Sequence, residues 1–240
     1  MFAPTVIQFP GARRRVGTIA RGTTITRRRL QIALGSLWLI DGVLQAQPFM
    51  FGRGFATQVI DAAGQGQPGF VSAPVHWLST VIAAHPAAWN VPFALIQLLL
   101  GVGLLYHRTA RLALAASIAW ALGVWYFGEG LSGLASGQAS LTTGAPGSAL
   151  LLAILATAAW PTRADGSSER PASWLPFAWA AIWVGGAVFQ ALPQNADRAV
   201  PNGLLVVAEY LTGVGALARS TRRAAAALGL VLALAFREHT

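Results

Sequence analysis

Two carboxylates stand inside long apolar stretches of the sequence, where an ionised group is costly. Asp41 lies within residues 31–51 and Glu209 within residues 202–218. A carboxylate at the centre of a membrane helix costs about 2.5–3.5 kcal/mol on the insertion scale, so such residues are usually paired, protonated or functional. Asp41 and Glu209 are therefore candidates for proton transfer or ligand binding. The structural alternative is a buried acid that only hydrogen-bonds a neighbouring helix.

Three glutamines accompany these acids in the apolar stretches. Gln45 follows Asp41 by one helical turn on the same face, Gln97 lies near the middle of a later stretch, and Gln190 ends another. An amide can donate to a carbonyl and accept from a carboxyl O–H. We therefore expect Asp41 to face the interior of a helix bundle in its protonated form and to contact Gln45 or Gln97.

Further candidates lie where helices are predicted to leave the membrane. Glu129 follows the aromatic run that begins at Trp125, and aromatic residues gather at membrane interfaces. A carboxylate there could meet a cationic or quinol ligand, although a solvated loop carboxylate is the simpler interpretation. His76 lies beside Trp77 in a segment with one apolar face, and it is the third candidate at this interface.

The sequence predicts no metal site and no covalently held cofactor. It contains no Cys, which excludes disulfides, iron–sulfur clusters and c-type haem attachment. The four histidines lack the spacing of a zinc motif and form no pair placed to hold haem. P-loop, nucleophile-elbow and dinucleotide-binding motifs are absent from the sequence as well. No cofactor is certain, and a redox role would need a quinone, another non-covalent cofactor or a partner subunit.

Composition indicates that lipid is the main solvent. Of the 240 residues, 55% are hydrophobic and 10% are charged, and the mean hydropathy is +0.54. Soluble domains carry about 25% charged residues. The net charge is +9, and every basic residue is Arg. Because the arginines flank apolar stretches, they are typical of a membrane protein rather than of a nucleic-acid-binding protein, and nucleic acid is not a predicted partner.

One stretch of twelve residues occurs twice. Residues 37–48 (LWLIDGVLQAQP) are similar to residues 182–193 (IWVGGAVFQALP), so that Trp38 matches Trp183 at an offset of 145. Self-similarity at a fixed spacing predicts two related bundles in tandem. A shorter motif, Gly-Val-Gly, is also shared and occurs at residues 101–103 and 213–215.

The two copies differ in where they carry the acid. Asp41 in the first copy corresponds to Gly186 in the second, at the offset of 145. Glu209 corresponds to Gln97, at the offset of 112 that aligns the Gly-Val-Gly motifs. Each predicted bundle therefore keeps one carboxylate, but on a different helix of its first pair.

The apolar stretches predict an all-α, polytopic transmembrane bundle of about seven helices, four in the first copy and three in an incomplete second copy. The helices are expected near residues 31–51, 89–106, 112–127, 147–160, 174–192, 202–218 and 224–236. The predicted domains are an Arg-rich cytoplasmic arm (1–30), a first bundle (31–161) with an extracytoplasmic segment (52–90), a cytoplasmic linker (162–173) and the second bundle (174–240). Within the extracytoplasmic segment, apolar spacing around Trp77 predicts a short helix lying on the membrane surface.

The arginines predict the orientation. With the N-terminus in the cytoplasm, fourteen arginines fall on the cytoplasmic side and three on the other. The positive-inside rule therefore favours this orientation, with residues 52–90 outside. Seven spans place the C-terminus outside, and four spans between the copies make the repeat parallel rather than inverted.

Several small and apolar motifs of the first copy resemble those of the DoxX/DoxD-like group of bacterial membrane proteins. They are Gly35-x-x-Trp38 with Gly42 and Pro48, the segment Gln97–Gly103 before a basic turn, and Gly144-Ala145-Pro146-Gly147 before the fourth helix. The resemblance covers about residues 31–161. This sequence departs from the group at Gln45, where a Lys is commonly expected.

The resemblance implies a bacterial inner-membrane protein that serves as a redox-linked subunit, without identifying active residues. Members of the group have four helices, and some resemble the membrane subunit of a thiosulfate:quinone oxidoreductase. Three functions remain open: an accessory subunit linked to quinone-dependent redox chemistry, a small-solute or proton-coupled transporter, and a purely structural membrane subunit. A redox-enzyme partner and a homo-oligomer are compatible with the first of these, and whether the chain is an enzyme stays undecided.

Overall fold

The computed structural model describes residues 25–140, 143–161, 172–195 and 202–235, and within them the protein is all helical. Most of the predicted arm and linker therefore lie outside the described residues. The α-helices are α1 (Arg27–Gln45), α2 (Asp61–Ala63), α3 (Gly69–Ala84), α4 (Pro86–Leu105), α5 (Ala110–Phe127), α6 (Ser148–Ala158), α7 (Leu175–Gln190), α8 (Asn202–Gly215) and α9 (Arg222–Ala235). Shorter helical turns are η1 (Pro48–Phe51), η2 (Phe55–Ile60), η3 (Gly130–Gly133) and η5 (Pro193–Asn195).

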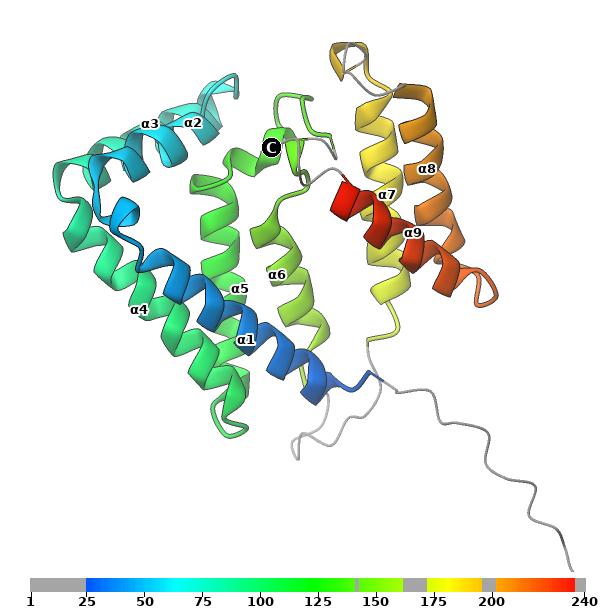
Figure 1. Ribbon diagram of the computed structural model, residues 1–240, viewed down its shortest axis with the longest axis horizontal. Coiled ribbons are helices and arrows are strands. Elements are labelled where there is room, and N and C mark those ends of the chain that lie inside the picture. The colour runs from blue at the N-terminus through cyan, green and yellow to red at the C-terminus, as the bar shows by residue number, and fades with distance from the viewer. Residues whose placement is uncertain (1–24, 141–142, 162–171, 196–201, 236–240) are drawn as a thin grey trace, which may run out of the picture.

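The helices form two groups (Figure 1). Helices α1, α4, α5 and α6 pack together as the first bundle, whereas α7 packs on α8 and α8 on α9 as the second bundle. A helical hairpin made of η2, α2 and α3 lies across one end of the first bundle (Figure 1). This hairpin has its own core of Phe55, Ala56, Ile60, Val71, Val75 and Ile82. The short helix predicted around Trp77 is therefore α3, and it is longer than expected.

Local signals explain where the helices of the first bundle begin and end. The hydroxyl of Thr26 accepts a hydrogen bond from Arg29 N–H at 3.2 Å and caps α1, and Pro86 opens α4 at a position where its missing N–H costs nothing. Helix α1 ends at Gln45, and Pro48 begins a separate 3₁₀ turn. The predicted helix of residues 31–51 was therefore placed about one turn too far along the chain. Asp41 consequently lies one turn from the C-terminal end of α1 instead of near its middle.

Glycines allow the first two long helices to touch backbone to backbone. A Cβ atom on Gly101 would lie 2.9 Å from the Gly35 carbonyl oxygen and 2.6 Å from Leu39 Cγ. In the second bundle, a Cβ on Gly213 would lie 3.1 Å from the Ala180 carbonyl oxygen and 2.7 Å from Val184 Cγ2. Small residues at helix crossings are the usual means of close packing inside a membrane.

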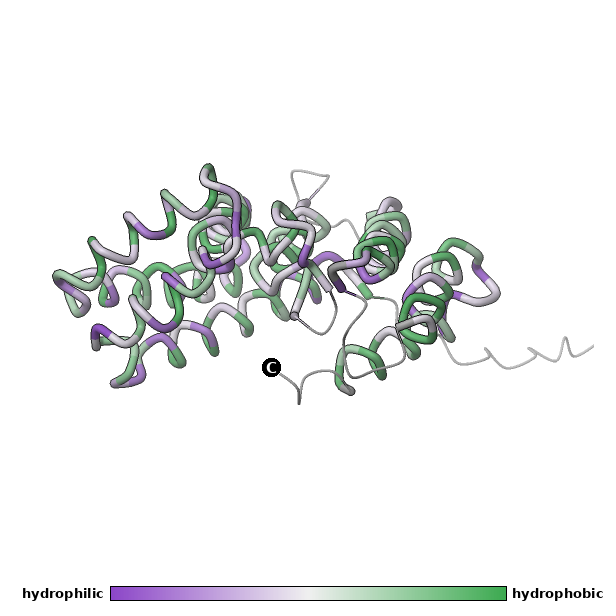
Figure 2. The backbone as a smooth tube through the Cα atoms, turned by 90° about the horizontal axis from the view of Figure 1, so that it is seen from above, coloured by the Kyte–Doolittle hydropathy of each residue, from purple (hydrophilic) through white to green (hydrophobic). Residues whose placement is uncertain are grey.

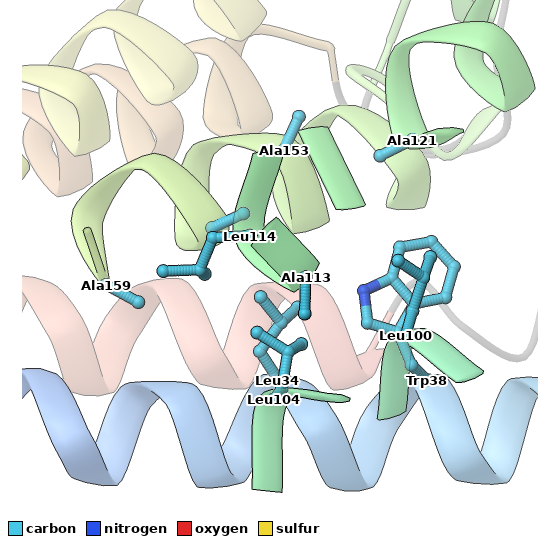
Figure 3. Close-up of a cluster of buried hydrophobic side chains, with 10 residues drawn as sticks. Leu34, Trp38, Leu100, Leu104, Ala113, Leu114, Ala121, Ala153 and Ala159 are labelled. Carbon is cyan, nitrogen blue, oxygen red and sulfur yellow. The ribbon is translucent and has the colours of Figure 1, made fainter. Parts of the chain in front are cut away.

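The core of the first bundle is small, and Figure 3 shows most of it. Leu34, Trp38 and Leu104 meet alanines of α5 and α6 there, and the Trp38 indole donates to Ser117 Oγ at 2.7 Å. Hydrophobic residues recur along the length of the helices (Figure 2). The large exposed side chains include Leu37, Ile40 and Val43 of α1, Leu95, Leu99 and Val102 of α4, and Leu204, Val207 and Leu211 of α8. Small residues at the helix crossings together with many large apolar residues on the outside are typical of membrane helices.

Two of the described helices are long and apolar enough to cross a membrane, Pro86–Leu105 and Ala110–Phe127. Four shorter helices are also apolar: Gly69–Ala84, Ser148–Ala158, Leu175–Gln190 and Gly203–Gly215. The chain is thus an all-helical protein with the features of membrane association.

Candidate functional site

Asp41 and Glu129 come within electrostatic range of each other although 88 positions separate them in the sequence. Their carboxyl groups lie close enough for their charges to interact, and Asp41 is only half-buried. Asp41 makes no hydrogen bond to any residue that the structure describes. The hydrogen-bonded contact with Gln45 or Gln97, expected from the sequence, is therefore not formed.

Glu129 is held as the cap of a neighbouring helix. Its Oε1 accepts hydrogen bonds from Ser148 Oγ at 2.5 Å and from Ala149 N–H at 3.0 Å, at the first turn of α6. A carboxylate stabilises a helix N-terminus because the free N–H groups and the helix dipole both favour negative charge there. Glu129 is therefore a partly exposed loop carboxylate that also caps α6.

Trp125, one helical turn before Glu129, hydrogen-bonds the same loop. Its indole N–H donates to the Pro146 carbonyl at 2.8 Å. Gly147 has φ +100°, and a side chain there would overlap the Glu129 carboxylate and lie 3.0 Å from Trp125 Cδ1. Glycine at residue 147 is thus required both by the backbone and by the space around Glu129.

A left-handed turn follows Glu129. Residues 130–133 all have positive φ, including the non-glycine residues Leu131 (55°) and Ser132 (52°). Each such residue costs roughly 1–2 kcal/mol, so the surrounding contacts must hold the turn in place. It brings Ser132 Oγ to 3.5 Å from Glu129 Oε2 and packs Gly130 against the Ala63 carbonyl of the helical hairpin. Sequence reasoning missed this turn, and the spacing Gly130-x-x-Gly133 was the available signal.

Gln45 pairs with a residue that sequence reasoning also missed. Its Nε2 donates to Asn90 Oδ1 at 2.5 Å, and Asn90 Nδ2 donates back to the Gln45 carbonyl at 2.9 Å. Asn90 is completely buried, so the oxygen and the nitrogen of its side-chain amide both need these partners. The pair joins the end of α1 to the first turn of α4.

Gln97 is buried in α4, with 5% of its surface exposed, and its Oε1 has no hydrogen-bond partner. Gln190 is also buried, at the C-terminal end of α7, and is 1% exposed. Both candidates therefore face the interior of their bundles. Neither of them is brought together with Asp41 by any contact found in the described parts of the chain.

Glu209 is the most deeply buried acid of the described residues. It is 1% exposed, its Oε2 has no hydrogen-bond partner, and it forms no ion pair with a described residue. Its carboxyl lies against Gly186 of α7, where a Cβ atom would be 3.5 Å from Oε2. The carboxyl thus occupies space next to a position that carries no side chain.

An apolar cleft of about 430 Å³ separates the two bundles. One wall comes from α6 and the loop before it, and the other from α7. Its lining residues are Leu134, Ala139, Ser140, Ala145, Pro146, Leu150, Ile154, Ala178, Ala181, Ile182, Gly185, Gly186 and Phe189. Beside the cleft, the Asn195 amide donates to the Gly137 carbonyl at 3.1 Å and links the two bundles. Gly186 therefore lines the cleft and also contacts Glu209.

His76 lies apart from the other candidates. Its Nδ1 is 2.7 Å from Asp61 Oδ1, and the pair lines a hollow of about 340 Å³ on the helical hairpin together with Ser72. The His76 side chain is 76% exposed. Across the described ranges, no three His, Asp or Glu side chains gather to hold a metal ion.

Arginines cap the ends of helices in both bundles. Arg28 Nη1 donates to the Leu104 carbonyl at 2.9 Å, and Arg222 Nε donates to the Ala216 carbonyl at 2.8 Å. Arg28 also binds the carbonyl of residue 105, and Arg222 that of residue 217. A cation at a helix C-terminus satisfies free carbonyls and complements the dipole. These arginines therefore have structural partners at the helix ends.

Comparison of the chain with protein-family models, with curated proteins and with solved structures finds no match in any of the three. The function is therefore inferred from the geometry of these residues.

Proposed function

We propose that the chain is a multi-pass protein of a bacterial inner membrane, with about seven transmembrane helices and a cytoplasmic N-terminus. The packing supports this proposal, because small residues lie between the helices and large apolar ones point outward. The arginines support the orientation, since fourteen of seventeen lie at one predicted face. The shorter helices would need tilted neighbours or a locally thin bilayer to span it.

The proposed architecture is a tandem repeat of a four-helix and a three-helix bundle. Matching contacts at matching offsets support it. Gly103 lies against Ala113 and Thr109, and Gly215 against Ala225 and Thr221, each 112 positions later. The Thr109 hydroxyl donates to the Gly103 carbonyl at 2.7 Å, and the Thr221 hydroxyl donates to the Gly215 carbonyl at 2.6 Å. Trp38 contacts Ser117, and its counterpart Trp183 lies 3.0 Å from a Cβ built on Gly229.

Within this architecture, the protein acts as an accessory subunit linked to quinone-dependent redox chemistry. The observation that carries the proposal is the unpartnered carboxyl oxygen of Glu209 beside an apolar cleft. A buried polar group without a partner is costly, so its retention favours a ligand that completes the hydrogen bond. The resemblance to DoxX/DoxD-like proteins points to the same chemistry. A catalytic partner subunit would supply the electron transfer that this Cys-free chain lacks groups to perform.

The test is quinone content. The full-length protein is purified with its native lipids, and quinone and phospholipid are extracted and measured together. We expect a quinone-to-phospholipid ratio several-fold above that of the source membrane. A ratio equal to that of the membrane would contradict the proposal, because it would mean that quinone is carried over only as bulk lipid.

A proton-coupled transporter is the second candidate, favoured by the proximity of Asp41 to Glu129. Acids inside a membrane protein often belong to proton relays, and Asp41, Glu129 and Glu209 supply three acids across the two bundles. Vesicles that contain the protein and a pH-sensitive dye would report proton flux. Flux that is lost in Asp41→Asn would favour transport, and no flux from the native protein would exclude it.

A further inference from the structure

We propose that the cleft between α6 and α7 holds an acyl chain of a phospholipid from the outer leaflet, which fills the space between the two bundles. The inference goes beyond the proposed function. It rests on the membrane placement of the chain and does not depend on where a quinone binds. Both walls supply large, half-buried apolar side chains: Leu150 and Ile154 from α6, and Ile182 and Phe189 from α7.

One face of α7 forms a wall of the cleft along most of the helix. The α7 residues in this wall recur at the spacing of a single helical face: Ala178, Ala181, Ile182, Gly185, Gly186 and Phe189. The buried Ala180 lies on another face, with its carbonyl against Gly213 of α8. Helix α7 therefore presents one face to its own bundle and a second, apolar face to the cleft.

The side chains of the protein leave the space beside this wall unfilled. A Cβ atom built on Gly185 meets no atom within 4 Å, and the cleft has a volume of about 430 Å³. Walls that face such a space lose the dispersion contacts that a close-packed interior provides. A molecule from outside the chain would restore these contacts.

The chemistry of the lining selects hydrocarbon as the occupant. Ser140 is the one polar residue in the lining, and it already pairs with Thr143, whose hydroxyl oxygen accepts from Ser140 N–H at 3.0 Å and lies 3.5 Å from Ser140 Oγ. Water in an apolar space lacks the hydrogen-bond partners that would hold it there. A polar ligand would lose its hydration without gaining partners. An acyl chain has no polar group to satisfy and is the hydrocarbon that surrounds a membrane helix.

The length and position of the cleft fit a single leaflet. Ala178 and Phe189 are eleven positions apart, which is about 17 Å along a helix. One leaflet supplies half of a hydrocarbon core that is about 30 Å thick, so the cleft is about as long as one leaflet is deep. Phe189 lies next to the C-terminal end of α7 and Pro146 just before α6, and both ends face outward in the proposed topology. The acyl chain therefore enters from the outer leaflet.

The chain offers a matched pair of variants to test this arrangement. Gly185 in α7 and Gly123 in α5 both lie in apolar helices, and a Cβ built on either meets nothing within 4 Å. Gly185 lines the cleft, whereas Gly123 does not. Gly185→Leu should therefore fold normally and fill the cleft. Gly123→Leu adds the same side chain and the same gain in helix propensity elsewhere.

The first measurement is the amount of phospholipid that stays with the protein. The full-length protein is purified in a mild detergent and washed with lipid-free detergent, and the remaining phospholipid is extracted and measured by mass spectrometry. We expect the native protein and Gly123→Leu to keep close to a single phospholipid per chain. Gly185→Leu should keep several-fold less. Thermal unfolding followed by circular dichroism checks that both variants are folded.

The second measurement locates the acyl chain. A phospholipid with a photoreactive diazirine in its acyl chain is added to the washed native protein, and the modified peptides are mapped after illumination. We expect modification of α6 and α7 at cleft residues such as Leu150 and Ile182, and unlabelled phospholipid should compete with it. The neighbouring Leu151, which is exposed and outside the lining, should not be protected by this competition.

These outcomes separate the inference from the proposed function. Equal retention of phospholipid by folded Gly185→Leu and by the native protein would overturn the inference, as would modification spread evenly over the outward faces. Retention of a quinone in place of phospholipid would also overturn it, while supporting the proposed function. The membrane placement itself is tested independently by thiol labelling of intact cells.

Discussion

The Glu129 carboxylate accepts a hydrogen bond from Ala149 N–H at 3.0 Å, so a residue just beyond the end of α5 caps α6. The two residues are 20 positions apart in the sequence, and the left-handed turn at residues 130–133 lies between them. Glu129 thus links the end of α5 to the start of α6 through hydrogen bonds. Its charge also acts on Asp41.

Removing this cap should destabilise the first bundle. We expect Glu129→Ala to lower the free energy of unfolding by about 1–2 kcal/mol, because two N-terminal donors of α6 lose their acceptor. Thermal unfolding in detergent followed by circular dichroism would measure the loss. Asp61→Ala, which removes an acid from the exposed pair with His76, should cost less than about 0.5 kcal/mol. Equal effects of the two substitutions would show that the cap is not important.

The Gln45–Asn90 pair should behave as a coupled unit. Gln45→Ala leaves the buried Asn90 amide without one partner, at a cost of about 1–3 kcal/mol. The double variant Gln45→Ala/Asn90→Ala should cost clearly less than the sum of the single changes. Chemical denaturation of all three variants would reveal this coupling. Strict additivity of the two costs would mean that the hydrogen bonds contribute nothing to stability.

Close contact between α1 and α4 should make Gly101 intolerant of a side chain. Gly101→Ala would place a methyl 2.9 Å from the Gly35 carbonyl oxygen, and relieving that clash should cost about 1–3 kcal/mol. Gly123 lies in α5 with nothing within 4 Å of a built Cβ, so Gly123→Ala should be neutral or stabilise by up to about 1 kcal/mol. The relevant readout is the difference in melting temperature between the two variants. A Gly101→Ala protein as stable as Gly123→Ala would argue against this helix crossing.

Asp41 should be replaceable without loss of stability. It makes no hydrogen bond to a described residue and lies near the charge of Glu129, so Asp41→Asn and Asp41→Leu should each stay within about 0.5 kcal/mol of the native protein. Unfolding in detergent would compare the two variants. If Asp41→Leu alone lowered the free energy of unfolding by more than about 2 kcal/mol, Asp41 would have a polar partner inside the protein.

The proposed topology can be tested directly because the chain has no Cys. Gln65 lies exposed in the turn before α3, and His107 lies exposed in the turn between α4 and α5. We expect an impermeant thiol reagent to label Gln65→Cys in intact cells and to label His107→Cys only after the cells are opened. Labelling of His107→Cys alone in intact cells would reverse the orientation.

Much of the fold follows from local features of the sequence. Apolar stretches between Gly, Pro and Arg predicted helices close to α4 through α9, because hydropathy and helix breakers act over a few residues. The repeated motif drew attention to Gly186 and Glu209, which the structure places in contact. The burial of Gln97, Gln190 and Glu209 likewise agrees with the apolar surroundings of each in the sequence.

What only the tertiary structure decided is which polar groups meet. The partners of Gln45 and Glu129 lie 45 and 20 positions away, and no periodicity encodes such pairs. Asp41 does not pair with Gln45 because the Gln45 amide bonds Asn90 of α4 instead. The cleft depends on how α7 faces α6, and this arrangement arises only when two separately formed bundles pack together. Sequence patterns report the burial of each residue, whereas hydrogen-bond partners and cavities are properties of pairs of surfaces.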